Sequence, residues 1–157
     1  TAYIATSVAF DDEMKERVRK HQASRPKEWK TYEIYKDIYK IIKDISEKHQ
    51  TVILDCITLL VNNLMFTDGI DIDNASEEEI NELEAYIQDQ IKKLMEEVKK
   101  TDLYFVMVTN EIGLGVVPGY KLGRVYCDFV GRINQMLGKL SDEVYFVVCG
   151  IPTKIKG

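Results

Sequence analysis

Apolar residues gather in short, continuous runs along this chain, and most of these runs stop at polar residues. The runs cover residues 3–5, 51–54, 103–108 and 143–148. Runs of this length that are apolar at consecutive positions are typical of strands buried on both faces, as in a parallel sheet. Residues 152–155 are compatible with one further strand at the edge of that sheet.

Apolar residues at helical spacing fill the intervals between these runs. The predicted helices cover residues 11–22, 32–48, 59–66, 76–100 and 121–140. Ser76 and Glu79 have the spacing of a capping box, and an apolar stripe follows them from Ile80 to Val98. Strands that alternate with helices predict an α/β fold, with a mainly parallel sheet covered by helices on both faces.

The polar residues that follow the strands indicate where a site lies. They are Thr6 and Ser7, Asp55, and residues 109–111. The carboxyl ends of parallel strands meet at one edge of a sheet, and ligands of such sheets bind beyond that edge. The sequence therefore predicts that these side chains converge on one site.

The length and the charge of the chain narrow the class of protein. Residues 1–157 suit a single domain, and their net charge of −5 argues against non-specific nucleic-acid binding. No apolar run approaches the roughly 20 residues of a membrane helix, and no signal peptide is visible, so no membrane span is expected. The three cysteines lack C-x-x-C spacing, which indicates reduced thiols of a cytoplasmic protein.

Residues 18–33 contain the most distinctive side chains, including one of the two histidines. His21 follows Val18 by three positions in the first predicted helix, so we expect its imidazole to point toward the protein body. Pro26 ends that helix and favours an extended backbone at Arg25. An imidazole beside a cation is a candidate nucleophile or base near neutral pH. The competing interpretation is a half-buried histidine held by a carbonyl group.

Asp55 ends the β-branched and apolar run Thr51-Val-Ile-Leu54, in the way that a Walker B carboxylate, which holds Mg²⁺ directly or through water, ends its strand. Asp55 is therefore a candidate magnesium ligand. The pattern is weak, because many buried strands end in aspartate, and capping of the next helix is the competing role.

Taken together, these segments resemble one family over the whole chain. The segments that carry the resemblance are Tyr3-Ile-Ala-Thr-Ser7, Asp11-Asp-Glu-Met14, His21-x₃-Arg25-Pro26-x₂-Trp29-x-Thr31-x-Glu33, Leu54-Asp55-Cys-Ile-Thr58, Asn62-Asn-Leu64, Thr109-Asn-Glu-Ile-Gly-x-Gly-x-Val-Pro118, Arg132-Ile-Asn-Gln135 and Gly150-Ile-Pro-Thr-Lys-Ile-Lys156. The family is the bifunctional adenosylcobinamide kinase/adenosylcobinamide-phosphate guanylyltransferase of cobalamin biosynthesis. The block from His21 to Glu33 is a specific part of its pattern.

The resemblance implies a RecA-like P-loop fold, assembled as a homotrimer, that uses GTP, ATP and Mg²⁺. Such an enzyme phosphorylates the aminopropanol arm of adenosylcobinamide and then transfers GMP from GTP to that phosphate through a GMP-histidine intermediate. His21 stands at the guanylylated position. The family's guanine-nucleotide contacts fall here on Ala5, Thr6, Ser7, Gln22, Ala23, Ser24, Arg25, Glu33 and Asp55.

The chemistry of this transfer explains the residue types. A neutral imidazole nitrogen attacks the α-phosphorus of GTP and displaces pyrophosphate, and the substrate phosphate then displaces the imidazole. Arg25 can offset charge on the transferred phosphate. A carboxylate, either Glu33 or Asp55, can accept hydrogen bonds from N1–H and N2–H of guanine, which adenine cannot match.

One motif of the family does not occur in this sequence. The family opens with a strand and a Walker A loop, and nothing in these 157 residues matches G-x-x-x-x-G-K-[ST]. We expect the complete protein to carry this strand and loop upstream of Thr1, which makes residues 1–157 an N-terminally incomplete domain. A chain that truly lacks the loop would have no kinase activity. The alternatives are therefore a guanylyltransferase alone and a non-catalytic nucleotide-binding remnant.

Overall fold

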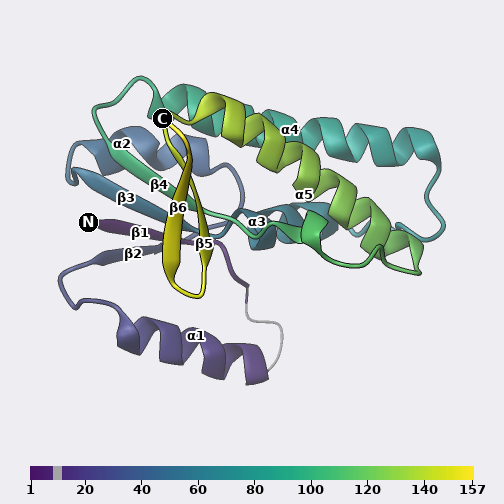
Figure 1. Cartoon of the computed structure of the whole chain (residues 1–157), viewed down its shortest axis with the longest axis horizontal. Coiled ribbons are helices and arrows are strands. Elements are labelled where there is room, and N and C mark those ends of the chain that lie inside the picture. Colours follow the sequence, from purple (N-terminus) through teal and green to yellow (C-terminus); the bar gives the residue numbers. More distant parts are fainter. Residues whose placement is uncertain (9–11) are drawn as a thin grey trace.

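A sheet of four parallel strands forms the centre of the computed structural model, which describes residues 1–8 and 12–157 (Figure 1). The strands are β1 (Ala2–Ala5), β2 (Lys30–Glu33), β3 (Thr51–Asp55) and β4 (Tyr104–Val108). They lie in the order β2-β1-β3-β4, and every neighbouring pair is parallel. The predicted α/β fold with a parallel sheet is confirmed for these strands.

Helices connect the strands. They are α1 (Asp12–Ser24), α2 (Ile42–Ser46), α3 (Ile57–Phe66), α4 (Glu77–Val98) and α5 (Lys121–Leu140), with the 3₁₀ helices η1 (Ile38–Ile41) and η2 (Ile112–Leu114). The predicted helices over 59–66, 76–100 and 121–140 are confirmed as α3, α4 and α5. The helix predicted over 11–22 is confirmed as α1, although residue 11 itself lies outside the described residues.

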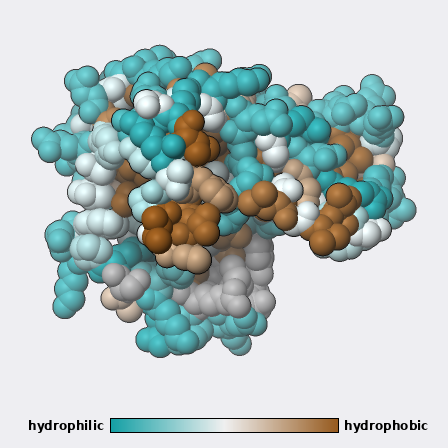
Figure 2. Space-filling view, viewed as in Figure 1, coloured by the Kyte–Doolittle hydropathy of each residue, from teal (hydrophilic) through white to brown (hydrophobic). Residues whose placement is uncertain are grey.

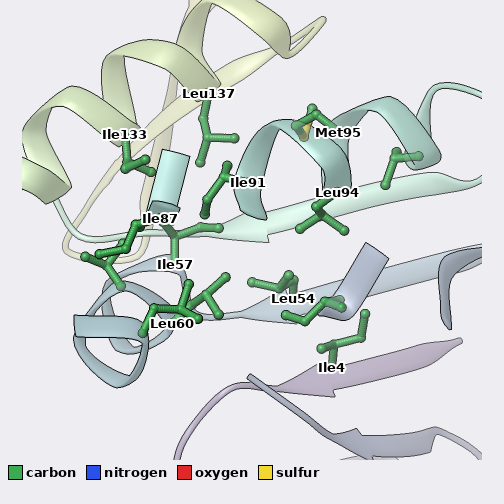
Figure 3. Close-up of a cluster of buried hydrophobic side chains, with 14 of the residues drawn as sticks. Ile4, Leu54, Ile57, Leu60, Ile87, Ile91, Leu94, Met95, Ile133 and Leu137 are labelled. Atoms are coloured by element: carbon green, nitrogen blue, oxygen red, sulfur yellow. The ribbon is translucent and has the colours of Figure 1, made fainter. Parts of the chain in front are cut away.

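The hydrophobic core lies on one face of the sheet. Ile4 and Leu54 have no exposed surface, and they face helix residues such as Ile87, Ile91 and Ile133 of α4 and α5 (Figure 3). Burying one such aliphatic side chain stabilises the fold by about 1.5–3 kcal/mol. No α1 side chain that the structure describes belongs to this cluster, so the core confirms the predicted helix cover for one face only.

The start of α4 shows how local sequence sets an element. The hydroxyl of Ser76 accepts a hydrogen bond from the backbone N–H of Glu79 at 3.2 Å, and the carboxylate of Glu79 accepts one from the backbone N–H of Ser76 at 2.8 Å. Two backbone N–H groups that the helix leaves unpaired are satisfied in this way. The predicted capping box is confirmed.

The helix predicted over residues 32–48 is wrong in its first half. Residues 30–33 form β2, which pairs with β1, and regular helix begins only at Ile38. Asp37 has a left-handed backbone with φ of 55°, which interrupts a right-handed helix. Beyond this point the apolar spacing is correct, because Ile42 and Ile45 are fully buried.

The strand predicted over residues 143–148 forms, but its place in the parallel sheet was predicted wrongly. It is β5 (Val144–Val148), and it pairs antiparallel with β6 (Ile151–Lys156) in a separate two-stranded sheet. Cys149 and Gly150 form the turn with φ of 53° and 78°. Two turn residues with positive φ match the twist of a tight hairpin, and this local preference explains the antiparallel pairing. The edge strand predicted over 152–155 pairs with β5, not with the parallel sheet.

Apolar side chains remain exposed on β4 and on this hairpin. On β4, Tyr104 is 70% exposed and Val108 is 41% exposed, and within the described residues β4 has a strand neighbour on one side only. Figure 2 shows hydrophobic side chains gathered over the hairpin, where Val147 and Ile151 are more than half exposed. Both regions therefore leave apolar side chains exposed to solvent.

Candidate functional site

The ends of three strands bring together three of the predicted site residues. The strand register pairs Ala5 of β1 with Glu33 of β2 on one side and with Asp55 of β3 on the other. Two carboxylate residues therefore flank the end of β1 at the carboxyl edge of the sheet. Asp55 also pairs in register with Val108 of β4, so the polar residues that follow β1, β3 and β4 meet at this edge, as expected.

Thr6 lies just beyond this edge and is 1% exposed. Its hydroxyl accepts a hydrogen bond from the backbone N–H of Cys56 at 2.9 Å and donates one to the carbonyl of Cys56 at 2.8 Å. Its carbonyl accepts from Nδ2 of Asn63 at 2.6 Å. The side chain of Thr6 therefore ties β1 to the segment after β3, and its hydroxyl is already engaged in both directions.

A polar network extends from this point to the end of β4. Nδ2 of Asn110 donates to the hydroxyl of Thr58 at 2.8 Å, and the hydroxyl of Tyr126 donates to the carbonyl of Thr58 at 3.1 Å. Nδ2 of Asn134 donates to the carbonyl of Asn110 at 3.0 Å. The network fixes the segment after β4 against α3 and α5. Thr58 and Asn134 received no role in the sequence analysis, because only the folded chain shows what they contact.

Asp55 is held by a residue that the sequence analysis did not single out. The hydroxyl of Tyr3 donates a hydrogen bond to Oδ2 of Asp55. Burial, together with this hydrogen bond, raises the pKa of Tyr3 to about 12. The phenol therefore stays protonated and donates to the carboxylate at neutral pH. Its apolar neighbours gave the sequence no reason to treat Tyr3 as anything but a strand residue.

Arg25 lies over the ring of Tyr3. Its guanidinium carbon is 3.7 Å from the ring centroid, within the range of a cation–π contact. Trp29 stacks with the same ring at 6.3 Å between centroids. Nη1 of Arg25 donates to the hydroxyl of Thr31 at 3.5 Å, whereas Nε is buried and has no hydrogen-bond partner in the part of the chain that the structure describes. A phosphate oxygen is the kind of acceptor that such a donor binds.

A second contact ties the end of α1 to the same edge. Nε2 of Gln22 donates to Oε1 of Glu33 at 2.7 Å, and both side chains are exposed. Glu33 ends β2, so this hydrogen bond places the last turns of α1 next to the end of that strand. The predicted nucleotide contacts Gln22 and Glu33 are therefore neighbours.

His21 precedes Gln22 and lies in the last turn of α1, where its side chain is exposed. The side chain of His21 is not part of the core, and the direction of its imidazole stays a prediction. The competing expectation of a half-buried histidine is wrong, because the side chain is exposed. An exposed imidazole is accessible to a reagent in solution.

The remaining predicted contacts lie around these groups. Ala23 is exposed and Ser7 is half-buried, while the side chain of Ser24 lies outside what the structure describes. For magnesium, the described residues contain no group of three or more His, Cys, Asp or Glu side chains that could hold a metal ion. Asp55 could supply one carboxylate, which fits Mg²⁺ because this ion usually takes one or two protein carboxylates together with substrate phosphates.

No helix among residues 1–8 and 12–157 is long and apolar enough to cross a membrane.

The fold and the site define an α/β protein with polar groups collected at the carboxyl edge of a parallel sheet. The family model described as cobinamide kinase / cobinamide phosphate guanyltransferase matches residues 1–155. The chain belongs to this family of kinases and guanylyltransferases, and it is an enzyme of cobalamin biosynthesis.

Curated relatives support this assignment. The chain is 38% identical over 154 residues to the bifunctional adenosylcobalamin biosynthesis protein CobU of Escherichia coli, with 98% of this chain and 84% of that protein covered. The protein of the same name from Salmonella typhimurium gives the same identity and coverage. The corresponding protein CobP of Pseudomonas aeruginosa is 31% identical, over 99% of this chain and 82% of its own length.

Proposed function

We propose that the protein transfers GMP from GTP to adenosylcobinamide phosphate, with His21 as the residue that carries the GMP. The observation that supports this most directly is the hydrogen bond from Gln22 to Glu33. It brings the segment that holds the exposed His21 to the strand edge where Ala5 and Asp55 lie. Family membership supplies the reaction class, and the geometry supplies a nucleophile next to candidate nucleotide contacts.

The transfer runs in two displacements. In the first, a ring nitrogen of His21 forms a bond to the α-phosphorus of GTP, and the bond from that phosphorus to the pyrophosphate oxygen breaks. In the second, a phosphate oxygen of adenosylcobinamide phosphate bonds to the same phosphorus, and the bond to the imidazole breaks. The product is adenosylcobinamide-GDP, and His21 is regenerated.

The residues around His21 have distinct roles in this proposal. Arg25 offsets the charge of the transferred phosphate, since its Nε is a buried donor without a partner among the described residues. Ala5, Thr6 and Ser7 contact the nucleotide chiefly through their backbone, because the hydroxyl of Thr6 is engaged with Cys56. A magnesium ion, bound through Asp55 and the phosphates of the nucleotide, would supply neutralising charge.

The kinase reaction, which phosphorylates adenosylcobinamide with ATP or GTP, needs a phosphate-binding loop. We propose that the strand that carries this loop pairs along the open side of β4. The free edge and the exposed apolar residues of β4 support this placement, since a further strand would cover them. The result would be the P-loop fold that the family resemblance implies. Assembly as a homotrimer follows from the same resemblance, and light scattering of the full-length protein tests it.

Labelling with GTP that carries ³²P at the α-phosphorus tests the proposal. The full-length protein should retain label that is acid-labile and base-stable, and His21→Asn should abolish it. The chain offers a matched control, because His49 is its only other histidine. His49→Asn should label normally.

Label that survives in His21→Asn would overturn the role of His21. An unlabelled wild-type protein would instead support the non-catalytic remnant. Where labelling succeeds, a separate assay for phosphorylation of adenosylcobinamide distinguishes the bifunctional enzyme from a guanylyltransferase alone.

A further inference from the structure

We propose that Tyr3 is a positioning residue of the transfer site, which holds the carboxylate of Asp55 and the guanidinium of Arg25 in fixed places relative to each other. The inference rests on the guanylyl transfer proposed above. It adds a residue that lies outside the nucleotide contacts implied by the family resemblance.

The strand geometry gives Tyr3 this position. Successive side chains of a strand point to opposite faces, so Tyr3 lies on the face of the sheet opposite to the core residue Ile4. The register places Tyr3 beside Ile53, and its phenol reaches two residues along β3 to the carboxylate of Asp55. Tyr3 is only 7% exposed, so its ring is held by its surroundings.

The ring of Tyr3 also anchors a side chain from a different part of the chain. Arg25 follows α1, and its guanidinium lies 3.7 Å from the centroid of the ring. Fixing a free arginine side chain costs rotamer entropy. The contact with Tyr3, supported by the hydrogen bond to Thr31, meets this cost before a nucleotide arrives.

A single side chain thus couples two charged groups of opposite sign that the proposal uses. Asp55 lies at the end of β3 and Arg25 lies in the turn before β2, so no common element fixes their separation. Reacting groups must be placed to within about 1 Å, because larger errors cost on the order of a hundredfold in rate. Tyr3 supplies this placement through its hydroxyl on one side and its ring on the other.

Tyr3→Phe in the full-length protein tests the role of the hydroxyl. The variant keeps the ring below Arg25 and removes the donor to Asp55. We expect the rate of histidine labelling at saturating GTP to fall by about ten- to a hundredfold, as for the loss of one hydrogen bond to a charged group. The GTP concentration for half-maximal rate should change much less, because the ring still holds Arg25. Tyr32→Phe is the matched control, since Tyr32 lies on β2 and its hydroxyl contacts His49 instead of Asp55.

A double-mutant cycle with Asp55→Asn separates positioning from a general loss of structure. If Tyr3 acts through the carboxylate, Tyr3→Phe should cost little in the Asp55→Asn background. An equal cost in both backgrounds, or no cost in the wild type, would overturn the inference and leave the proposed function standing. A wild-type protein without label would instead overturn the proposed function, and the inference with it.

A second variant tests whether Tyr3→Phe loses labelling rate only because it folds poorly. Incorporation of 4-aminophenylalanine at position 3 restores a donor of similar length, so it should recover most of the labelling rate that Tyr3→Phe loses. A rate no higher than that of Tyr3→Phe would show that the hydrogen bond to Asp55 does not set the rate, and it would overturn the inference.

Discussion

Gln22 donates a hydrogen bond to Glu33 at 2.7 Å, and this contact joins the end of α1 to the end of β2. The two residues are eleven positions apart and belong to elements of different type. Since Glu33 pairs in register with Ala5, which in turn pairs with Asp55, the contact connects the helix to the strand ends of the site.

We predict that Glu33 reads the guanine base. Its carboxylate is exposed, and the hydrogen bond that its Oε1 accepts from Gln22 places it next to the last turn of α1, which carries His21. Glu33→Gln should lower the preference for GTP over ATP in the labelling of His21 by about tenfold or more, because a hydrogen bond to a charged group is lost. Competition between labelled GTP and unlabelled ATP measures this preference.

The exposed Glu28, which lies in the turn before β2, provides the control. Glu28→Gln should keep the preference of the wild type. An unchanged preference in Glu33→Gln would assign the guanine contact to another group, with Asp55 as the first candidate.

Thr6→Val should destabilise the fold. The substitution removes the hydroxyl that pairs with both the N–H and the carbonyl of Cys56 in a buried position, so both backbone groups lose a partner. The expected loss is about 2 kcal/mol in the free energy of unfolding. Urea denaturation measures it. Thr153→Val on the exposed strand β6 should change the free energy by no more than about 0.5 kcal/mol. Equal effects of the two substitutions would show that the Thr6 contacts do not stabilise the fold.

The alkaline stability of the protein should depend on Tyr3. Its pKa is raised from 10.0 to about 12 in the folded protein, first by burial and then by the hydrogen bond to Asp55. Between pH 10 and about pH 12 the phenol of Tyr3 loses its proton in the unfolded chain and keeps it in the folded protein. The contribution of Tyr3 to the free energy of unfolding is therefore complete below pH 10 and is lost toward pH 12. Urea denaturation at several pH values should show a steeper decline for the wild type than for Tyr3→Phe. Parallel curves would contradict the assignment.

Ser76→Ala should shorten or loosen the start of α4. The change removes the hydroxyl that accepts from the backbone N–H of Glu79, and loss of such a cap costs about 1 kcal/mol. Thermal or urea unfolding followed by circular dichroism measures this cost. Ser141→Ala is the control, because the C-cap of α5 bonds through its backbone N–H to the carbonyl of Leu137. A cost at Ser141 as large as that at Ser76 would contradict the role of the cap.

The sequence predicted those elements whose signals are local. The capping box at Ser76 and the apolar stripe behind it predicted α4, and consecutive apolar residues predicted β3 and β4. β2 was missed because Lys30–Glu33 carries no strand pattern of its own and becomes a strand only by pairing with β1. Tertiary pairing overrode local preference there.

What the sequence determined by itself is the class of fold, the family and the identity of the chemically distinctive residues, because apolar spacing and residue type are properties of the chain alone. The tertiary structure decided where those residues lie. It exposed His21, placed Gln22 against Glu33, and gave Tyr3 its contacts with Asp55 and Arg25. These outcomes depend on strand register and on the docking of a helix end, which join residues from separate elements and so leave no periodic signal in the sequence.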